Sequence, residues 1–370
     1  MMSIDQLGGV LQVRPGVARP ATLTGTRPDW SAQLAPGRPA HALPGMLAAI
    51  HSLCSHAHRL CAQAAVDAAL GRDTPPAEGA RTLRRETLRE HLRRILLDWP
   101  RLPGATLADA AGPAPDVLAG CPAFSAGADD GSLLLWIERQ LLGGPAQRWL
   151  AAHERDPVQA WERWCEGSSG WLAQCMRRIR PLADVPLSGA APLRVHADDM
   201  ALRGLAGALR DDDGFSRRPQ VCGACAETGS WTRLNDPAGT PRSAWLRLGA
   251  RVAELVRLAL PDTAARSGTA WLRSGSLALS PGEGLAWIEM ARGLLVHHVM
   301  LDGHGEGARI AACHVLAPTE WNFHPDGAVA CALEALPESG SMEQVAVLMA
   351  AYDPCVRYDL LQRHGEHIHA

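Results

Sequence analysis

The sequence predicts an α+β fold that is mostly helical, with a central helix bundle and a small sheet. Two patterns predict this class. Apolar residues recur at helical spacing through most of the chain, while residues 285–316 carry the dense apolar, turn-interrupted pattern of a β-hairpin. Because 370 residues exceed one small core, we expect one large domain with lobes, or two domains that share an interface.

The first 40 residues are rich in Gly, Pro and Arg, with a short alternating stretch at Val10–Val13. They predict a strand or two and a covering loop, and we separate this region (1–40) from a helical domain (41–370). From Leu43 to Leu70 the chain fills with Ala, Leu and His, which predicts a helix. A linker at 73–79 follows. The next helix ends before Pro100 and has apolar residues near helical spacing at Leu83, Leu88, Leu92, Ile95 and Leu96.

The middle of the chain predicts a loop at 101–128 and helices near 131–151, 156–181, 197–209 and 242–260, with an irregular stretch at 211–238. The hairpin follows, with strands around 287–301 and 310–316 and a turn at 302–307. We interpret Gly282–Gly284 as a simple turn. Ser341 and Gln344 match a capping box that begins a helix at about 342–352. The N-terminal strands and the hairpin are expected to form the small sheet together.

Composition and charge exclude several classes of function. The formal net charge is −3, without a dominant basic stretch, so we expect no nucleic-acid partner. No apolar run approaches the ~18 residues that span a bilayer, so we expect no membrane association. The first residues lack a secretory signal and a twin-arginine segment. These features predict a cytoplasmic protein.

The ten cysteines are expected to remain thiols, because most lie in apolar or helical stretches of a long, cytosolic-looking chain. Half of them fit the role of small buried hydrophobic residues: Cys121, Cys165, Cys175, Cys313 and Cys331.

Four segments, in the same order and register, resemble the large subunit of [NiFe] hydrogenases. The first is Gly37–Pro39 with His51–Cys61, similar to GRdP and R-x-C-G-x-C-x-x-x-H, and the second is Glu227–Gly229 with Arg233, similar to ETGxxxR. The third is Glu289–His297 with Ala317–Gly327, similar to EAPRGxLxH and aPTxWNfxpxG. The fourth is Tyr352–Tyr358, similar to SfDPCxxC. The resemblance implies a degenerate large-subunit-like fold whose last motif lies at 353–355.

The departures from that pattern concern the metal ligands. In the enzymes two CxxC pairs supply four thiolates to nickel, and the second cysteine of each pair bridges to iron. Here the first positions are Cys54 and Cys355, but the bridging positions are Ala57 and Tyr358. Nickel in those enzymes needs the full set of soft sulfur ligands, so we expect no nickel. The motif histidine is replaced by Cys61, and the terminal histidine that marks processing of the enzyme is missing.

Together with the stretch Leu88–Pro100, this pattern resembles the HupK/HoxV family of hydrogenase accessory proteins. The resemblance implies a protein that is not an enzyme but a scaffold or chaperone in maturation. It would assemble or transfer an iron with cyanide and carbonyl ligands, held transiently. The implied partners are HypC-like and HypD-like maturation proteins and the immature hydrogenase large subunit.

Cys54 and Cys355 are the candidate iron ligands. By analogy with the enzymes, Arg292 would donate hydrogen bonds to the cyanides, and His58 and Cys61 would lie around the iron unit. Cys54, His58 and Cys61 also share one helix face at i, i+4 and i+7, so a local metal site on that helix is an alternative to a face that is partly buried.

Two other functions stay open. One is a divergent hydrogenase-like metal-binding subunit or H2 sensor, which four-thiolate nickel binding would reveal. The other is a metal-free decoy that occupies hydrogenase partners, which would tolerate replacement of Cys54 or Cys355.

Three further segments have ordinary explanations. Cys222–Cys225 is a CxxC in a Gly/Pro-bounded loop, without the second pair that a zinc ribbon needs, so it is interpreted as an incidental or weakly redox-active pair. The tail Arg363–Ala370 is histidine-rich and is expected to be solvated. Asp211–Asp213 is expected to be a surface loop.

Overall fold

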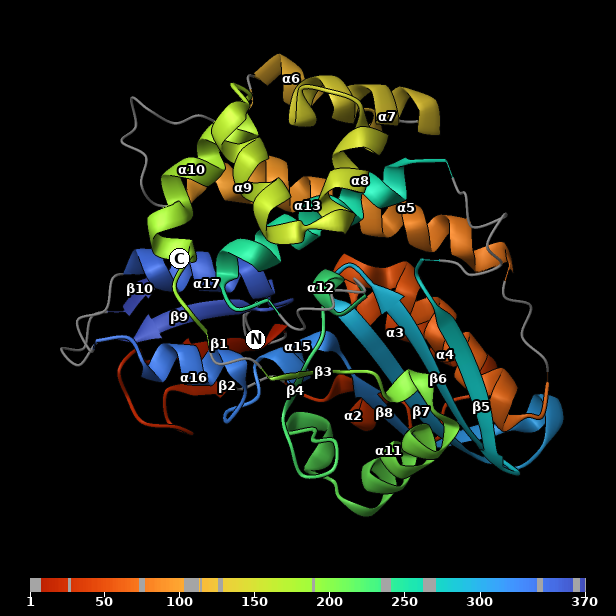
Figure 1. Ribbon diagram of the computed structural model, residues 1–370. Coiled ribbons are helices and arrows are strands. Elements are labelled where there is room, and N and C mark those ends of the chain that lie inside the picture. Colours follow the sequence, from red (N-terminus) through yellow and green to blue (C-terminus); the bar gives the residue numbers. More distant parts are fainter. Residues whose placement is uncertain are drawn as a thin grey trace.

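A computed structural model describes residues 8–25, 28–72, 77–102, 113, 115–125, 129–187, 190–233, 241–261, 271–337, 342–361 and 367–369. Figure 1 shows a helical lobe above a part that contains the sheets. Among the described residues, no helix is both long enough and apolar enough to cross a bilayer. The predicted α+β, mostly helical class is confirmed.

The larger sheet is antiparallel and consists of β5 (Ser274–Ser280), β6 (Glu283–Met290), β7 (Gly293–Asp302) and β8 (Arg309–Leu316), in that order. Every residue of β6 is buried, because α4 (Ser55–Ala69) packs on one face and α11 (Asp199–Asp211) on the other. Successive side chains therefore alternate between two cores: Leu285 and Trp287 belong to the core with α11, and Ala286 and Ile288 to the core with α4.

The predicted hairpin corresponds to β7 and β8, and the sheet extends beyond it to β6 and β5. Gly282 does lie in a turn, with φ +81°, but the interpretation of Gly282–Gly284 as a turn alone was wrong, since β6 begins at Glu283. A Cβ on Gly284 would lie 2.4 Å from the carbonyl oxygen of Ala65, so glycine at this position lets α4 approach the sheet closely.

The helix predicted at 43–70 is interrupted. The chain forms α3 (Leu43–Ile50), a 3₁₀ turn (Ser52–Cys54) and then α4. The break places Cys54 at the N-cap of α4. The carboxylate of Glu86, on the next helix, accepts the backbone N–H groups of His56 and Ala57 at 2.8 and 3.0 Å, which satisfies two donors of the first turn of α4.

The helical lobe surrounds α13 (Ala244–Ala259), in which nearly every residue is buried. Helix α5 (Ala77–Arg93) continues through a π turn (Arg94–Asp98) to a 3₁₀ turn at Trp99–Arg101. The predicted helix at 131–151 is divided at Gly143, which has φ +70°. The remaining helices of the lobe are α6 (Pro115–Ala119), α7 (Asp130–Ile137), α8 (Ala146–Arg155), α9 (Pro157–Gly167) and α10 (Trp171–Ala183).

The two ends of the chain meet in a second sheet of order β10-β9-β1-β2. Strand β1 (Val10–Val13) pairs in parallel with β9 (Arg357–Leu361) and antiparallel with β2 (Leu23–Gly25), while β10 (His367–His369) borders β9. The expectation of one shared sheet was therefore wrong: the N-terminal strands pair with the C-terminal segment, and the hairpin belongs to the larger sheet.

Short elements connect these parts. They are α2 (Trp30–Leu34), β3 (Ala191–Pro192) paired in parallel with β4 (Ala226–Glu227), α12 (Ser230–Arg233), α15 (Pro318–Asn322), α16 (Ala328–Glu334) and α17 (Met342–Tyr352). Helix α17 has the predicted bounds; the proposed cap, Ser341, lies outside the described residues.

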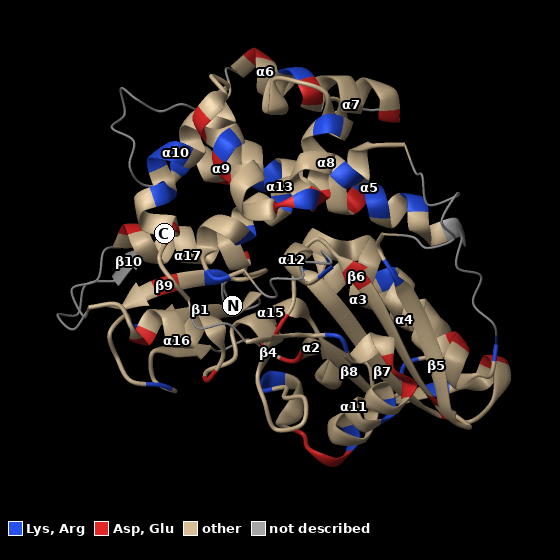
Figure 2. Ribbon diagram, viewed as in Figure 1, with Lys and Arg blue, Asp and Glu red and all other residues tan. Residues whose placement is uncertain are grey.

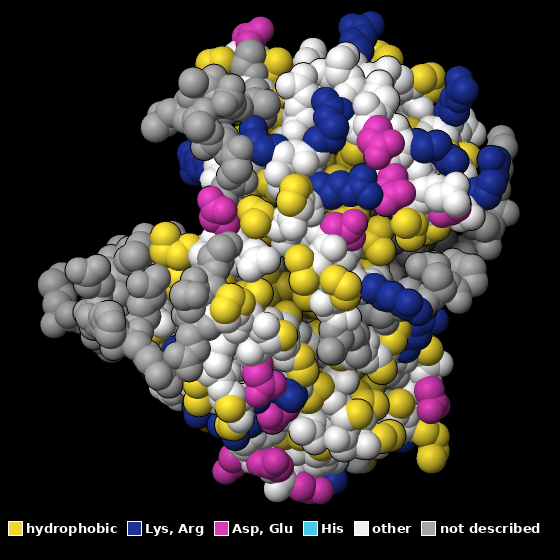
Figure 3. All heavy atoms as spheres, turned by 60° about the vertical axis from the view of Figure 1, so that its left-hand side comes forward, with side chains coloured by type: hydrophobic (Ala, Val, Ile, Leu, Met, Phe, Trp, Pro, Cys, Tyr) yellow, Lys and Arg dark blue, Asp and Glu magenta, His cyan; other side chains and the backbone are white. Residues whose placement is uncertain are grey.

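Charge is distributed unevenly over the fold. Basic side chains are frequent on the helical lobe, and the strands of the larger sheet carry few charges (Figure 2). Acidic residues gather at the end of α11, where Asp211–Asp213 are exposed as expected. On the face shown in Figure 3, basic and acidic side chains are interspersed over the lobe.

Candidate functional site

Arg292 lies in the tight turn between β6 and β7, and residues distant in the sequence hold that turn. Gly293 has φ +132°, and a Cβ there would lie 2.5 Å from the side chain of Thr228. The Thr228 hydroxyl accepts the N–H of Leu294 at 2.9 Å, and the Asn322 amide pairs with both backbone groups of Thr228 at 2.8 Å. Three of the motif segments therefore fix the position of the Arg292 backbone.

The Arg292 side chain is buried in a network of ion pairs. Its Nη2 donates to Glu90 Oε2 at 2.6 Å, and its Nε lies 3.4 Å from Asp353 Oδ2. Asp353 also pairs with Arg251 at 2.7 Å and with Arg94 at 2.8 Å. Burial alone would raise the pKa of Asp353, but the three arginines hold it well below its usual value.

Cys355 follows this network directly and is positioned by Thr319, in the first turn of α15. The Thr319 hydroxyl donates to Cys355 Sγ at 3.0 Å and accepts the Cys355 N–H at 3.3 Å. Asp353, two residues earlier, has φ +53°, which is uncommon for a residue other than glycine. The three arginines that surround its carboxylate hold this backbone conformation in place.

Both candidate cysteines lie within electrostatic range of the Arg292 guanidinium. Burial would lower the pKa of Arg292, but it is raised above its usual value by Asp353 and Glu90, and further by Cys54 and Cys355. The Cys54 side chain is 7% exposed at the N-cap of α4, and Cys355 is partly buried. Folding thus brings both cysteines into the electrostatic range of one buried cation.

Two donor nitrogens of Arg292, Nε and Nη1, are buried and have no hydrogen-bond acceptor among the described residues. Nε lies within ion-pair distance of Asp353, at 3.4 Å. A buried charged donor without an acceptor is unfavourable, so Nη1 indicates a place for a negatively polarised ligand. No group of three or more His, Cys, Asp or Glu side chains in the described part of the chain could hold a metal ion unaided.

His58 and Cys61 lie on α4 and contact the larger sheet. His58 Nδ1 is 3.1 Å from His297 Nε2, and its ring stacks on His51 with centroids 3.9 Å apart. Burial lowers the pKa of His297 to about 3, so this imidazole is neutral. The Cys61 thiol donates to the carbonyl of Ala286 at 3.4 Å, and burial raises its pKa far above the usual value. Cys61 therefore remains a thiol inside the core.

Comparison with known proteins identifies the family. No protein-family model matches the chain. The chain is 42% identical over 385 residues to the hydrogenase expression/formation protein HoxV of Cupriavidus necator, with 98% of each chain covered. It is 30% identical over 380 residues to the hydrogenase expression/formation protein HupK of Rhizobium leguminosarum bv. viciae, with 99% of this chain and 98% of the relative covered.

The chain belongs to the HoxV/HupK family. This confirms the resemblance predicted from the motifs.

Solved structures confirm the large-subunit-like fold of this HoxV/HupK chain. A [NiFeSe] hydrogenase variant from Desulfovibrio vulgaris Hildenborough matches with a TM-score of 0.52 at 16% identity, covering 93% of this chain and 92% of that one. The [NiFeSe] hydrogenase of Desulfomicrobium baculatum matches with a TM-score of 0.52 at 15% identity, covering 93% and 95%. At these identities the likeness concerns the fold.

The positions that would bridge to iron in the enzymes hold no sulfur in this HoxV/HupK chain. Ala57 is fully buried in the first turn of α4, with its N–H bound to Glu86. Tyr358 is partly buried on β9, where it pairs with Leu11 of β1. Each bridging position is thus part of a regular element and carries a methyl or a phenol group.

Sequence reasoning missed several residues that hold the site. Thr319 lies within the matched aPTxWN segment, and Asp353 within the DPC segment, but neither was assigned a role. Glu90 and Arg94 lie one helical turn apart in the family-like stretch 88–100, and that i, i+4 spacing places both toward the network. Arg251 shows no local signal, because only its burial within α13 reveals its partner.

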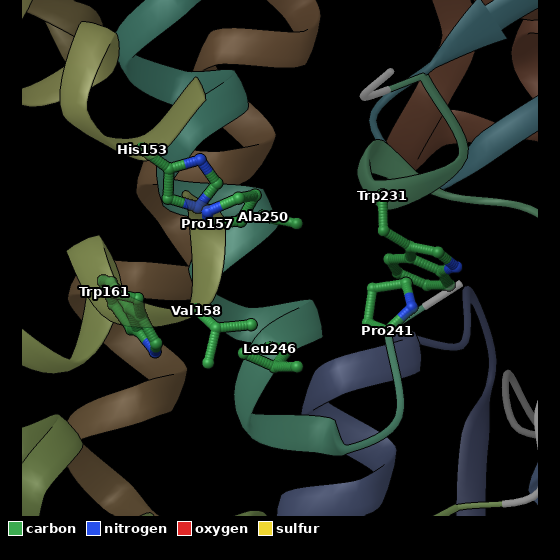
Figure 4. Close-up of a pocket in the computed structure, with 8 residues that line it drawn as sticks. All are labelled: His153, Pro157, Val158, Trp161, Trp231, Pro241, Leu246 and Ala250. Carbon is green, nitrogen blue, oxygen red and sulfur yellow. The ribbon is translucent and has the colours of Figure 1, made fainter. Parts of the chain in front are cut away.

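A small open hollow lies elsewhere, between α9, α13 and α12. Figure 4 shows that Trp231 and Pro241 face it from one side and His153 and Leu246 are among the residues on the other. Its lining is largely apolar, and burial lowers the pKa of His153 to about 4. None of its lining residues belongs to the network around Arg292.

Proposed function

We propose that this chain acts in hydrogenase maturation as a non-catalytic scaffold. It would hold an iron that carries cyanide and carbonyl ligands and pass it to the immature hydrogenase large subunit. The names of its relatives, which are hydrogenase expression/formation proteins, support the maturation role. The single observation that carries the cargo proposal is the buried Arg292 guanidinium within electrostatic range of Cys54 and Cys355, with Nη1 lacking a hydrogen-bond acceptor among the described residues.

The charges around Arg292 suit an anionic iron unit. Glu90 accepts a hydrogen bond from Nη2 and Asp353 lies 3.4 Å from Nε, but Nη1 has no acceptor among the described residues. A cyanide nitrogen is a strong, negatively polarised acceptor, and a charge-assisted hydrogen bond to it would satisfy this donor. Two cysteine thiolates would add protein ligands to the same iron, losing their protons to solvent on binding.

The incomplete set of sulfurs favours release. Two protein thiolates and the diatomic ligands leave the iron less firmly bound than four thiolates would, since Ala57 and Tyr358 offer no soft ligand. The same shortage argues against nickel. A scaffold must give up its cargo, so weak protein ligation is a requirement of the proposed role.

The proposed partners follow from the cargo. HypC-like and HypD-like maturation proteins would supply the iron unit, and the immature large subunit would receive it. In this scheme the chain catalyses no turnover of its own.

Infrared spectroscopy tests the cargo. The chain is purified anaerobically from cells that contain the maturation machinery, and we expect carbonyl and cyanide stretching bands. Cys54→Ser and Cys355→Ser should each abolish these bands. Cys165→Ser, at a buried cysteine of the helical lobe, should leave them unchanged. Arg292→Lys, which keeps the charge but removes Nη1, should shift the cyanide bands more than the carbonyl band.

Two results would contradict this assignment. Well-folded protein without bands, in strains where Cys54→Ser still supports hydrogenase activity, would favour the metal-free decoy. Stoichiometric nickel in the purified chain would favour the divergent hydrogenase-like subunit.

A further inference from the structure

A second group of thiols lies around the CxxC segment. Val221 and Ala224 exchange two backbone hydrogen bonds of 2.9 and 3.0 Å, which closes a two-residue turn at Cys222 and Gly223. Cys222 has φ +51° there, an uncommon conformation for a residue with a side chain. The turn exposes Cys222 and places Cys225 immediately after it, partly buried and just before β4.

Cys225 meets an imidazole from a distant segment. Its Sγ lies 3.2 Å from Nδ1 of His324, a residue that follows α15. The same Nδ1 accepts the N–H of Asp326 at 3.0 Å, so this nitrogen is unprotonated, and on binding a metal it would exchange that hydrogen bond for the metal bond. A neutral imidazole nitrogen beside a cysteine sulfur is a pair of ligands that zinc prefers.

Cys331, on α16, lies near the segment that contains His324 and Asp326. Its Sγ lies 3.9 Å from the carbonyl oxygen of Asp326, whose N–H is bound to His324. Cys331 also lies within electrostatic range of Cys225. The sulfurs of Cys225 and Cys331 therefore both lie near the short segment 324–326, which carries the imidazole of His324. Cys222 is three residues before Cys225 in the chain.

We propose that Cys225, His324 and Cys331, with Cys222 as the fourth ligand, bind one divalent cation of the zinc class. Three Cys and one His is a common structural zinc set, and the spacing of Cys222 and Cys225 matches the usual C-x₂-C pair. Cys225 and His324 are already in contact, while no three such groups in the described residues yet surround one point. Cys222 is exposed and Cys331 partly exposed, so both have room to rotate onto the ion.

The ion would join two segments that hold the site around Arg292. Strand β4 leads from Cys225 to Thr228, which binds the Arg292 turn, and α15 leads from Thr319, which binds Cys355, to His324. A cation between Cys225 and His324 would keep these two segments together, in addition to the Thr228–Asn322 hydrogen bonds. Its role is structural, and it is distinct from the iron cargo.

Cobalt and zinc titrations test the site. The full chain is used with His364, His367 and His369 replaced by alanine, so that the tail cannot bind metal, under reducing anaerobic conditions. We expect one Co²⁺ per chain, with thiolate-to-cobalt charge-transfer absorption that Zn²⁺ abolishes. Cys225→Ser and Cys331→Ser should each weaken binding by at least about 100-fold, more than the usual loss of an outer-shell partner. Cys54→Ser and Cys165→Ser should bind as before.

A second measurement avoids variants that fail to fold. Alkylation of the native chain, mapped by mass spectrometry, should show that bound Zn²⁺ protects Cys222, Cys225 and Cys331 and leaves the reactivity of Cys355 unchanged. Equal alkylation of Cys225 and Cys331 with and without Zn²⁺ would overturn the proposal. Cobalt absorption that persists in the Cys225→Ser/Cys331→Ser double variant would do the same.

Discussion

At the scale of single residues, Asp353 connects the charge network to the cysteine loop. Its carboxylate is buried and pairs with arginines from three separate elements: the π turn after α5, α13 and the β6–β7 turn. Its pKa is held well below the usual value, so it stays ionised in the folded protein. Removing this charge would leave three buried or partly buried guanidinium groups with too few acceptors.

Asp353→Asn should therefore lower the free energy of unfolding by about 3 kcal/mol at pH 7. A carboxyl group with a depressed folded pKa stabilises the protein fully above its unfolded pKa of about 4, and that contribution is lost as the pH falls below this value. The variant should consequently lose less stability between pH 5 and pH 3 than the original chain. Glu90, whose pKa is also lowered, keeps part of this pH dependence. Urea unfolding at several pH values measures this. Asp211→Asn, at an exposed position, is the control. If the free energy of unfolding of Asp353→Asn changed with pH as it does in the original chain, Asp353 would not be the source of this pH dependence.

At the scale of elements, the contact between α4 and β6 determines where Cys54 lies. Gly284→Ala would bring a Cβ to 2.4 Å from Ala65 O and 2.5 Å from Ala69 N, both backbone atoms that cannot rotate away. We expect α4 to shift and the free energy of unfolding to fall by about 1–3 kcal/mol. Because Cys54 is the N-cap of α4, the infrared bands of the cargo should weaken as well.

Gly307→Ala is the matched control for this substitution, since nothing lies within 4 Å of a Cβ at that position. It should change stability by less than about 0.5 kcal/mol. Equal unfolding midpoints for the Gly284→Ala and Gly307→Ala variants would show that α4 does not depend on this close approach.

The sequence predicts those helices and strands that are determined by interactions within their own segment. Helix α17 has the predicted bounds because its start and its apolar pattern lie within one segment. The break before Cys54 was missed because the acceptor for the first turn of α4 is Glu86, on another helix. Strand β5 was missed because Ser, Gly and Ala have little strand preference, and pairing with β6 determines its conformation.

The residues of the candidate site also fall into two groups, those that sequence motifs reveal and those that only the fold reveals. Cys54, Cys355 and Arg292 were named from motifs, and folding brings all three into one electrostatic environment. Thr319 and Asp353 lie in matched motifs, but their contacts require the fold. The contact between Cys225 and His324 joins segments about a hundred positions apart, so the CxxC looked incomplete in the sequence.

At the scale of the whole molecule, the parallel pairing of β1 with β9 brings the two ends of the chain together beside the cysteine loop. Tyr358 lies on β9 opposite Leu11, and Ala57 lies at the start of α4. In the proposed role, these two positions determine how firmly the chain holds iron, because they are where the enzymes have their bridging sulfurs.

The double variant Ala57→Cys/Tyr358→Cys should therefore keep its cargo longer. With two added thiolates, release of the iron unit to the immature large subunit should slow by at least about tenfold, because differences in affinity between related complexes appear mainly in the rate of dissociation. Loss of the carbonyl band after mixing with the large subunit measures the rate. The Ala57→Ser/Tyr358→Ser variant introduces side chains of similar size without sulfur. It therefore distinguishes the effect of added thiolate ligands from the effect of the cavity that loss of the phenol ring leaves. Equal release rates for the two double variants would mean that soft ligands at these positions do not control transfer.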